Sequence, residues 1–345
     1  MRCRLRITRL CVWSLLVIVF SSASASAITP IPEESGFSGY INVGGAYISA
    51  ETNMVKGTDL FEIGDDPLAS LSSSPDSESD ATFILNGELA YTFADTGTQI
   101  YVGNQLEDFL RFDFASLLGV RQNLPDGSIG AVSAVFQPLV TEVWKDPYVT
   151  GVKRQDTDRE GTGVRLEWDR PFGSNLGFLY QFRSIDIDDE QSGTQGGLGL
   201  TPNEVRLLDR QGDIHRADLF YLWKLGGGQA LIPELRYIKW DLDGQAMASD
   251  GGFFNLTYAY KGDIFSLTTT AGGGIEEFDR RNPVFDKTRE DDTYGFGVNA
   301  FWHKPFGFPP GFSLVGTLAW YESDSNISFY DSQVTYAGLS VFYRF

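Results

Sequence analysis

Apolar and polar residues alternate with period two in segment after segment of the chain. Between Phe83 and Phe93, apolar side chains stand at most of the odd positions, while Asn86, Glu88 and Thr92 lie between them. The same alternation returns in residues 164–169, 176–183 and 294–303. Because successive side chains of a strand point to opposite faces, this pattern predicts strands with one apolar and one polar face.

Along the whole chain this alternation predicts about fourteen strands, with twelve to sixteen possible. The predicted number is even. Short turns such as residues 125–127 and 226–228 alternate with long polar stretches such as 52–81 and 189–213. Outer-membrane barrels join their strands in this way, with tight periplasmic turns and long external loops. The predicted strands are 37–51, 82–94, 98–106, 112–123, 128–143, 161–171, 175–188, 214–225, 229–242, 252–261, 264–279, 292–304, 312–323 and 328–345. We therefore predict an all-β, antiparallel, up-and-down transmembrane barrel with acidic extracellular loops.

The end of the chain separates this barrel from a soluble β-sandwich, which would show the same alternation. Leu339, Val341, Tyr343 and Phe345 occupy alternate positions, and Phe345 is the last residue. An apolar strand left free at a sheet edge would invite aggregation, whereas a barrel closes that edge. The pattern also resembles the signal that the outer-membrane assembly machinery reads, so we expect that machinery to be a partner.

The N-terminus predicts export. Four arginines precede the apolar run 12–20, and the small residues 25–27 match a cleavage site, so residues 1–27 are predicted to be a cleaved signal peptide. The apolar run is too short to span a bilayer. Residues 28–345 are then one barrel domain in the outer membrane of a Gram-negative bacterium, surrounded by lipid and lipopolysaccharide.

Charge and cysteine content exclude several classes of partner and of chemistry. The leader holds four of the 27 basic residues, which leaves 23 against 46 acidic ones and a net charge near −23. Nucleic acid is therefore excluded as a partner, and divalent cations are favoured. Both cysteines, Cys3 and Cys11, lie in the leader, so no disulfide or thiol nucleophile is expected. We predict no cofactor beyond a loosely held divalent cation.

If apolar residues face the lipid, a balanced set of charges faces the lumen. One interpretation is a water-filled pore whose opposed charges act on passing solutes. The other is a network of salt bridges that fills the interior. The predicted lumen-lining residues are Glu88, Asp113, Arg121, Arg165, Glu167, Asp169, Arg183, Asp218, Lys224, Glu234, Arg236 and Lys261.

Two loop segments carry carboxylates at every second position. On an extended backbone such side chains point the same way and could offer oxygen ligands to a cation such as Ca²⁺. A solvated rim is the alternative, and we favour it because no EF-hand pattern follows. The candidate ligands are Asp76, Glu78, Asp80, Asp156, Asp158 and Glu160. In another loop, Thr201 and Glu204 form a capping-box pattern that predicts a short helix over 202–210, either folded into the pore or resting on its rim.

The sequence argues against an enzyme. Only His215 and His303 could serve as a catalytic base, and neither has a serine two residues away on the same strand face, the arrangement of outer-membrane phospholipases. No phosphate-binding loop, dinucleotide fingerprint or zinc-ligand spacing is present. We expect no catalytic residues, and a lipid hydrolase ranks last among the functions considered.

Several segments resemble an outer-membrane family of unknown function, filed as domain of unknown function 2860. The resembling segments are residues 31–39, 73–80, 104–114, 141–151 and 157–165, together with the last strand. The resemblance implies the same barrel class. It implies no activity and no ligand residues, because the function of the family is not established.

These observations predict a porin-like diffusion channel for small hydrophilic solutes or ions. The alternative is a plugged barrel that acts as a surface receptor, adhesion or envelope-structural protein and binds divalent cations or lipopolysaccharide. A transporter of apolar solutes ranks lower, since residues 28–36 are too short to form an N-terminal plug. The sequence assigns neither the solute nor the oligomeric state.

Overall fold

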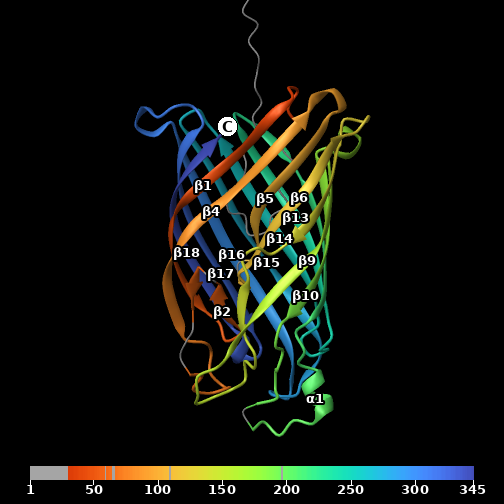
Figure 1. The fold of residues 1–345 in the computed structure, drawn as a ribbon, viewed down its shortest axis with the longest axis vertical. Coiled ribbons are helices and arrows are strands. Elements are labelled where there is room, and N and C mark those ends of the chain that lie inside the picture. Colours follow the sequence, from red (N-terminus) through yellow and green to blue (C-terminus); the bar gives the residue numbers. More distant parts are fainter. Residues whose placement is uncertain (1–29, 59, 64–66, 109, 196) are drawn as a thin grey trace, which may run out of the picture.

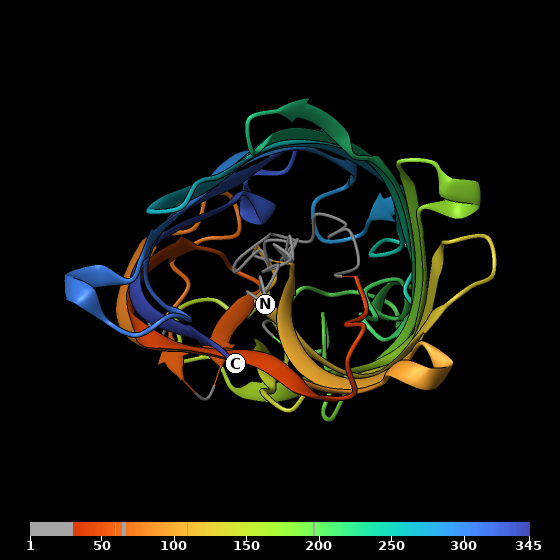
Figure 2. The same cartoon turned by 90° about the horizontal axis from the view of Figure 1, so that it is seen from above.

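The computed structural model describes residues 30–58, 60–63, 67–108, 110–195 and 197–345, so the predicted leader lies outside the described residues. The described chain forms one antiparallel sheet that closes on itself (Figure 1). The first strand, β1 (Gly36–Glu51), pairs with the last, β18 (Ser332–Arg344), with Val43 opposite Val341. Figure 2 shows these two strands side by side in the closed wall. The predicted fourteen-strand barrel is confirmed.

Twelve further strands complete the wall. They are β4 (Ser77–Phe93), β5 (Thr98–Asp108), β6 (Asp113–Asn123), β7 (Ile129–Phe136), β9 (Asp156–Asp169), β10 (Leu176–Ile187), β11 (Gly212–Tyr221, continued by β12, Trp223–Gly226), β13 (Gln229–Leu242), β14 (Ser249–Lys261), β15 (Phe265–Asn282), β16 (Lys287–His303) and β17 (Phe312–Ser325). We call the end with the short connections the turn end and the other the loop end. The C-terminus lies at the turn end (Figure 1).

Helical turns are few and short. Three 3₁₀ turns, η1 (Ala94–Thr96), η2 (Pro171–Gly173) and η3 (Pro305–Gly307), lie in the connections of the turn end. The loop end holds η4 (Ser328–Tyr330) and the single α-helix of the described chain, α1 (Pro202–Arg206). Within the described ranges, no helix has the length and apolarity needed to cross a membrane.

Several predicted strand limits at the loop end are wrong, and the reason is physical. The strands predicted to begin at residues 82, 161 and 292 begin five residues earlier, because polar segments counted as loops continue the hydrogen-bonded ladder. The predicted strand 128–143 is two strands, β7 and β8 (Thr141–Trp144), interrupted near Pro138. Proline has no N–H to donate to a ladder.

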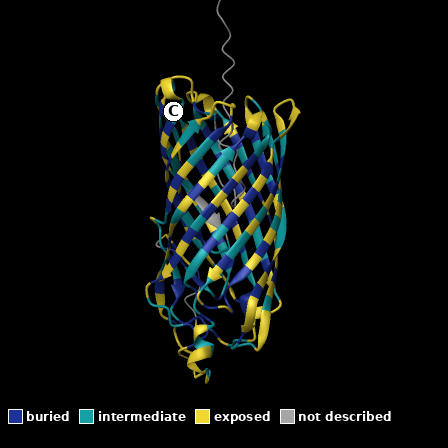
Figure 3. Ribbon diagram, turned by 90° about the vertical axis from the view of Figure 1, so that its right-hand side faces the viewer, coloured by how far each residue is buried: buried dark blue, intermediate teal, exposed yellow. Residues whose placement is uncertain are grey.

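The outer surface is an apolar band. Exposed and buried residues alternate along the strands (Figure 3), and the exposed positions are apolar around the middle of the barrel. Exposed aromatic residues flank this band: Phe172 and Phe306 at the turn end, Tyr47 and Tyr237 toward the loop end. An apolar belt between two aromatic girdles is the surface of a barrel that spans a bilayer.

The first loop contributes a small hairpin to the wall. Its strands are β2 (Val55–Thr58) and β3 (Phe61–Glu62), and β2 pairs with β8. β8 in turn pairs with β9, so β2 is joined to the sheet at the loop end. The β5–β6 hairpin does not reach as far toward the loop end as the strands on either side. Beyond it, the β2–β3 hairpin lies between β4 and β8. The sequence analysis did not predict this hairpin.

Candidate functional site: a capped cavity at the loop end of the lumen

Near the loop end the two faces of the strands exchange their chemistry: apolar side chains point into the barrel and polar ones point outward. In β13, Tyr237 is 50% exposed on the outside, but Trp240 faces inward and is only 7% exposed, with Lys239 and Asp241 outside. The strands continue beyond the aromatic girdle, where the outside is water, so their apolar side chains turn inward. The assumption that apolar residues face outward throughout is therefore wrong here. In the sequence, the alternating apolar residues move from odd to even positions after Tyr237, and this shift could have indicated the change.

These inward side chains form one apolar wall of a cavity of about 230 Å³. Strands β10, β11 and β13 supply Ile185, Ile187, Ile214, Ile238, Trp240 and Leu242, and Phe253, Phe278, Met54 and Val55 extend this apolar part of the lining. The rest of the lining is polar and charged, and includes Arg111, Asp113, Arg183, Arg216, Arg236, Glu276 and Arg289. A dry apolar cavity of roughly 150 Å³ holds benzene. This space therefore suits a molecule the size of a substituted single ring or a short alkyl chain.

Loop residues close the mouth above the cavity. The buried members of this cap are Leu68, Tyr148, Leu208, Ala246, Met247, Ile327, Phe329 and Tyr330, with Val284 and Phe285 packed against them. They come from six loops. The hydroxyls of Tyr148 and Tyr330 lie 2.7 Å apart, and the Asn282 amide donates to the Tyr330 hydroxyl at 2.7 Å. Burial raises the pKa of both tyrosines, so both hydroxyls stay protonated at neutral pH.

Helix α1 lies next to a segment of this cap. The Thr201 hydroxyl accepts from the Glu204 backbone N–H, and the Glu204 carboxylate accepts from the Thr201 N–H, so the predicted capping box is confirmed. The helix ends at Arg206 rather than 210. Leu208, just after it, is fully buried in the cap. The segment rests on the rim and anchors there, which decides between the two predicted placements.

Ion pairs form another part of the cavity lining and continue into the lumen. Arg183 of β10 pairs with Asp113 of β6, and both are buried. Strands β7 and β9 separate β6 from β10, so this pair reaches across the concave inner side of the wall. The Gln137 amide also donates to Asp113 at 2.7 Å. A second group joins Arg236 to Glu234 at 2.7 Å and to Asp218 at 3.0 Å.

The other predicted lumen charges are placed as follows. Arg121 pairs with Glu88 at 2.6 Å, Arg165 donates to Gln181 at 2.7 Å, Asp169 pairs with Arg170 at 3.0 Å, Glu167 is half-buried, and Lys224 and Lys261 lie exposed near the turn end. Neighbouring acids and bases thus pair, which favours the salt-bridge interpretation over separate rows of charge. A role of these residues in permeation stays a prediction.

Removing one member of the buried pair should destabilise the barrel. We expect Asp113→Ala to lower the free energy of unfolding by about 3–5 kcal/mol, because the Arg183 charge then loses its carboxylate in a buried place. The double variant Asp113→Ala, Arg183→Met should recover most of that loss. Urea unfolding of protein folded into lipid vesicles measures both, and equal stability of Asp113→Ala and wild type would refute the structural role of the pair.

The tip of the β5–β6 hairpin crosses the lumen, and sequence reasoning missed it. Arg111 donates to both oxygens of Glu276 at 3.1 Å, and its guanidinium lies 4.4 Å from the Trp240 ring centre. Ser249 also donates to Glu276, at 2.7 Å. Glu276 and Trp240 belong to β15 and β13, on a different part of the wall. Only the inward lean of the hairpin brings these residues together.

The loop carboxylates do not gather around a common point. Asp156 lies 3.4 Å from the Lys56 amine, and Asp80 accepts backbone N–H groups of Glu62 and Ala81. In the part of the chain that the structure describes, no group of three or more acidic, histidine or cysteine side chains could hold a metal ion. The cation site over Asp76–Asp80 and Asp156–Glu160 therefore stays a prediction.

The two histidines contact hydroxyl groups of neighbouring strands. His303 lies 2.7 Å from Ser266 and 2.9 Å from Ser313, while His215 lies 2.9 Å from the Tyr180 hydroxyl. The sequence analysis missed these serines because it considered only serines on the same strand as each histidine. A serine hydrolase orients its histidine with a carboxylate, whereas His303 contacts two serine hydroxyls and the Phe301 ring.

The model of the family described as "Protein of unknown function (DUF2860)" matches residues 36–344. The chain belongs to the DUF2860 family. No curated protein matches it in sequence.

Solved structures with a similar course of the chain are outer-membrane proteins. A FadL homologue of Pseudomonas aeruginosa has 12% identity and a TM-score of 0.44, with 89% of this chain and 90% of that chain covered. The outer membrane channel DcaP of Acinetobacter baumannii has 10% identity and a TM-score of 0.45, with 90% and 97% covered. The CymD monoaromatic hydrocarbon channel has 10% identity and a TM-score of 0.43, with 89% and 88% covered. Likenesses this distant carry no argument about what passes through the DUF2860 barrel.

Proposed function

We propose that this DUF2860 protein is a selective outer-membrane channel for small apolar molecules. The observation that carries the proposal is the apolar wall of the cavity beneath the cap, where Ile185, Ile214, Ile238 and Trp240 face a space of about 230 Å³. The lumen of a purely hydrophilic pore is polar, because its content is water. Charged side chains on the rest of the cavity lining are held in ion pairs, as Arg183 is with Asp113 and Arg111 with Glu276.

The cap supports this proposal over the porin-like channel predicted from the sequence. Tyr148, Phe329 and Tyr330 are almost fully buried at the mouth, and a polar solute would have to leave water to pass them. An apolar molecule meets no such cost. In this proposal the loop end faces the outside, lipopolysaccharide surrounds it, and the assembly machinery recognises the last strand up to Phe345.

The proposal predicts that a polar group in the cavity wall slows entry. Cells that lack their major porins and express the protein should take up radiolabelled toluene, a substituted single ring, faster than cells without it. Changing Ile238→Asn should slow this protein-dependent entry about tenfold, because an apolar molecule would then have to displace the water bound to the amide where it now contacts an apolar side chain.

The matched control is Thr257→Asn. Thr257 also faces the lumen, in β14, but is not part of the cavity lining, and it contacts the Thr270 hydroxyl at 2.8 Å. That variant should keep wild-type entry. Equal entry with Ile238→Asn and wild type, at equal amounts of folded protein, would contradict an apolar passage.

A further inference from the structure

A row of arginines borders the apolar wall of the cavity on the side of the turn end. On three neighbouring strands, an inward isoleucine has an inward arginine two residues nearer the turn end. The pairs are Ile185 and Arg183 in β10, Ile214 and Arg216 in β11, and Ile238 and Arg236 in β13. Two residues span about 7 Å of a strand, so the lining changes from apolar to cationic over that distance.

The ion pairs of this row turn their positive side toward the cavity. The Arg236 side chain is 13% exposed, whereas the side chains of its two partners, Asp218 and Glu234, are 0% and 1% exposed. Arg216 is 6% exposed, and its partner is the same Asp218. Both arginines line the cavity, and neither of the two carboxylates does.

The lining as a whole shows the same imbalance of charge. Among the described residues, seven arginines line the cavity, against two acidic residues, Asp113 and Glu276. The carboxylates of Asp218, Glu234 and Asp291 pair with lining arginines from outside the lining. An anion in the cavity therefore lies closer to positive than to negative charge, which favours its binding.

Arg216 and Arg236 are placed to act on one anion together. The Nε atoms of both donate to the same oxygen of Asp218, each at 3.0 Å, so the two guanidiniums lie side by side. A carboxylate on the cavity side approaches both positive charges at once. Charge-assisted hydrogen bonds between guanidinium and carboxylate groups are among the strong ones in proteins.

Another arginine lies at the mouth. Arg289 of β16 lines the cavity, and its guanidinium lies 4.1 Å from the ring centre of the cap residue Tyr330. Its side chain is 11% exposed, whereas that of its partner Asp291 is 2% exposed. An anion that passes the cap therefore regains at Arg289 part of the interaction that it loses on leaving water.

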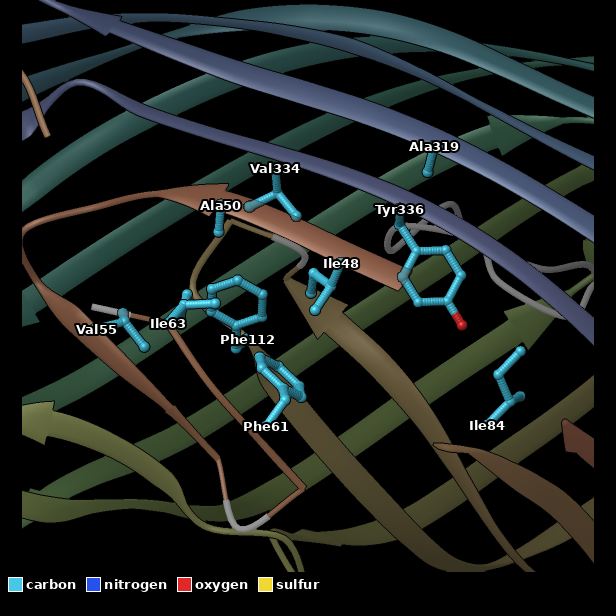
Figure 4. Close-up of a cluster of buried hydrophobic side chains, with 10 residues drawn as sticks. All are labelled: Ile48, Ala50, Val55, Phe61, Ile63, Ile84, Phe112, Ala319, Val334 and Tyr336. Carbon is cyan, nitrogen blue, oxygen red and sulfur yellow. The ribbon is translucent and has the colours of Figure 1, made fainter. Parts of the chain in front are cut away.

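An apolar cluster borders the cavity at the β2–β3 hairpin. Figure 4 shows its members Val55, Phe61, Ile63 and Phe112, of which Val55 also lines the cavity. The rings of Phe61 and Phe112 lie 5.2 Å apart. Packed apolar side chains keep water away from the cavity, and attraction between charges is stronger in such a place than in water.

We propose that the molecule for which this cavity is built is an apolar monocarboxylate, of the size of a substituted benzoate or a short-chain fatty acid. Its apolar body lies against Ile214, Ile238 and Trp240, and its carboxylate lies on the Arg216–Arg236 pair. The inference rests on the proposed function, since it names the class of molecule that uses the same cavity.

The test compares two probes of one shape. 4-Methylbenzoate and 4-methylbenzamide share the ring and the methyl group of toluene, but only the first carries a charge at neutral pH. Isothermal titration calorimetry on the folded protein in detergent micelles, with the heat of empty micelles subtracted, measures both. The dissociation constant should be at least about tenfold lower for 4-methylbenzoate, because hydrogen bonds to a charged group are stronger. Equal constants would overturn the inference.

Arg216→Met should remove most of this preference and leave the entry of toluene at the wild-type rate. Asp218 keeps Arg236 as a partner in this variant. Arg121→Met serves as the control, since Arg121 is an ion-paired arginine that does not line the cavity, and it should keep the full preference. An unchanged preference in Arg216→Met would show that the carboxylate does not lie on this pair.

The outcomes separate the two proposals. If toluene entry depends on the protein but the two probes bind equally, the carboxylate ligand is wrong and the proposed function stands. If toluene entry does not depend on the protein, the proposed function is wrong, whatever the probes do. Should Arg216→Met fail to assemble, the comparison of the two probes on the wild-type protein still decides the preference for charge.

Discussion

Replacing Phe329 with alanine should raise the ion conductance of the reconstituted barrel at least about tenfold. Phe329 is fully buried at the centre of the cap, where its ring contacts those of Tyr148, Phe285 and Tyr330. Truncating a buried phenylalanine costs about 3–5 kcal/mol, and each 1.4 kcal/mol shifts an equilibrium about tenfold. If only about 1.4 kcal/mol of this loss falls on the closed state of the cap, the open state becomes about tenfold more populated.

Planar-bilayer recordings measure this effect directly. Wild-type protein should show rare or small conductance steps, and Phe329→Ala should show frequent ones. The same substitution at Phe308, which lies half-exposed after η3 at the turn end, is the control and should behave as wild type. Large, steady conductance in the wild type would mean that the cap does not close the mouth, and the hydrophilic pore predicted from the sequence would then be the better interpretation.

The second large effect concerns the outer surface. Leu339→Arg should destabilise the folded barrel by about 2–4 kcal/mol in lipid vesicles, because it places a charge near the middle of the apolar band. Leu339 is 64% exposed and stands opposite Gly45, between the levels of Tyr47 and Tyr343. In cells, the variant should also reach the outer membrane in smaller amounts.

Thr335→Arg is the matched control on the same face of the same strand. Thr335 stands opposite Ser49, beyond the girdle residue Tyr47, so an arginine there reaches water. Its free energy of unfolding should change by less than about 1 kcal/mol. Equal losses for the two variants would show that the band around Leu339 does not lie in lipid.

In the proposed function the cap controls entry. Tyr148 and Phe329 must move aside before a molecule reaches the cavity, and the apolar side chains of the cap favour an apolar molecule.

The sequence by itself determined the barrel. Within the membrane, lipid outside and a filled lumen inside force a strict alternation, and residues such as Leu339, Val341 and Tyr343 carry it in a form that can be counted. It also determined helix α1, because the Thr201 and Glu204 capping box is a local interaction between neighbours in the chain.

Only the tertiary structure decided the candidate site. Above the membrane the same alternation changes its meaning, because water lies outside and packed loops lie inside, so Ile238 and Trp240 face a cavity. The cap joins six loops, and Arg111 meets Glu276 through a hairpin that leaves the wall. Contacts of this kind form between residues that are far apart in the chain. Period-two alternation indicates only which face of a strand a residue occupies, so it does not predict such contacts.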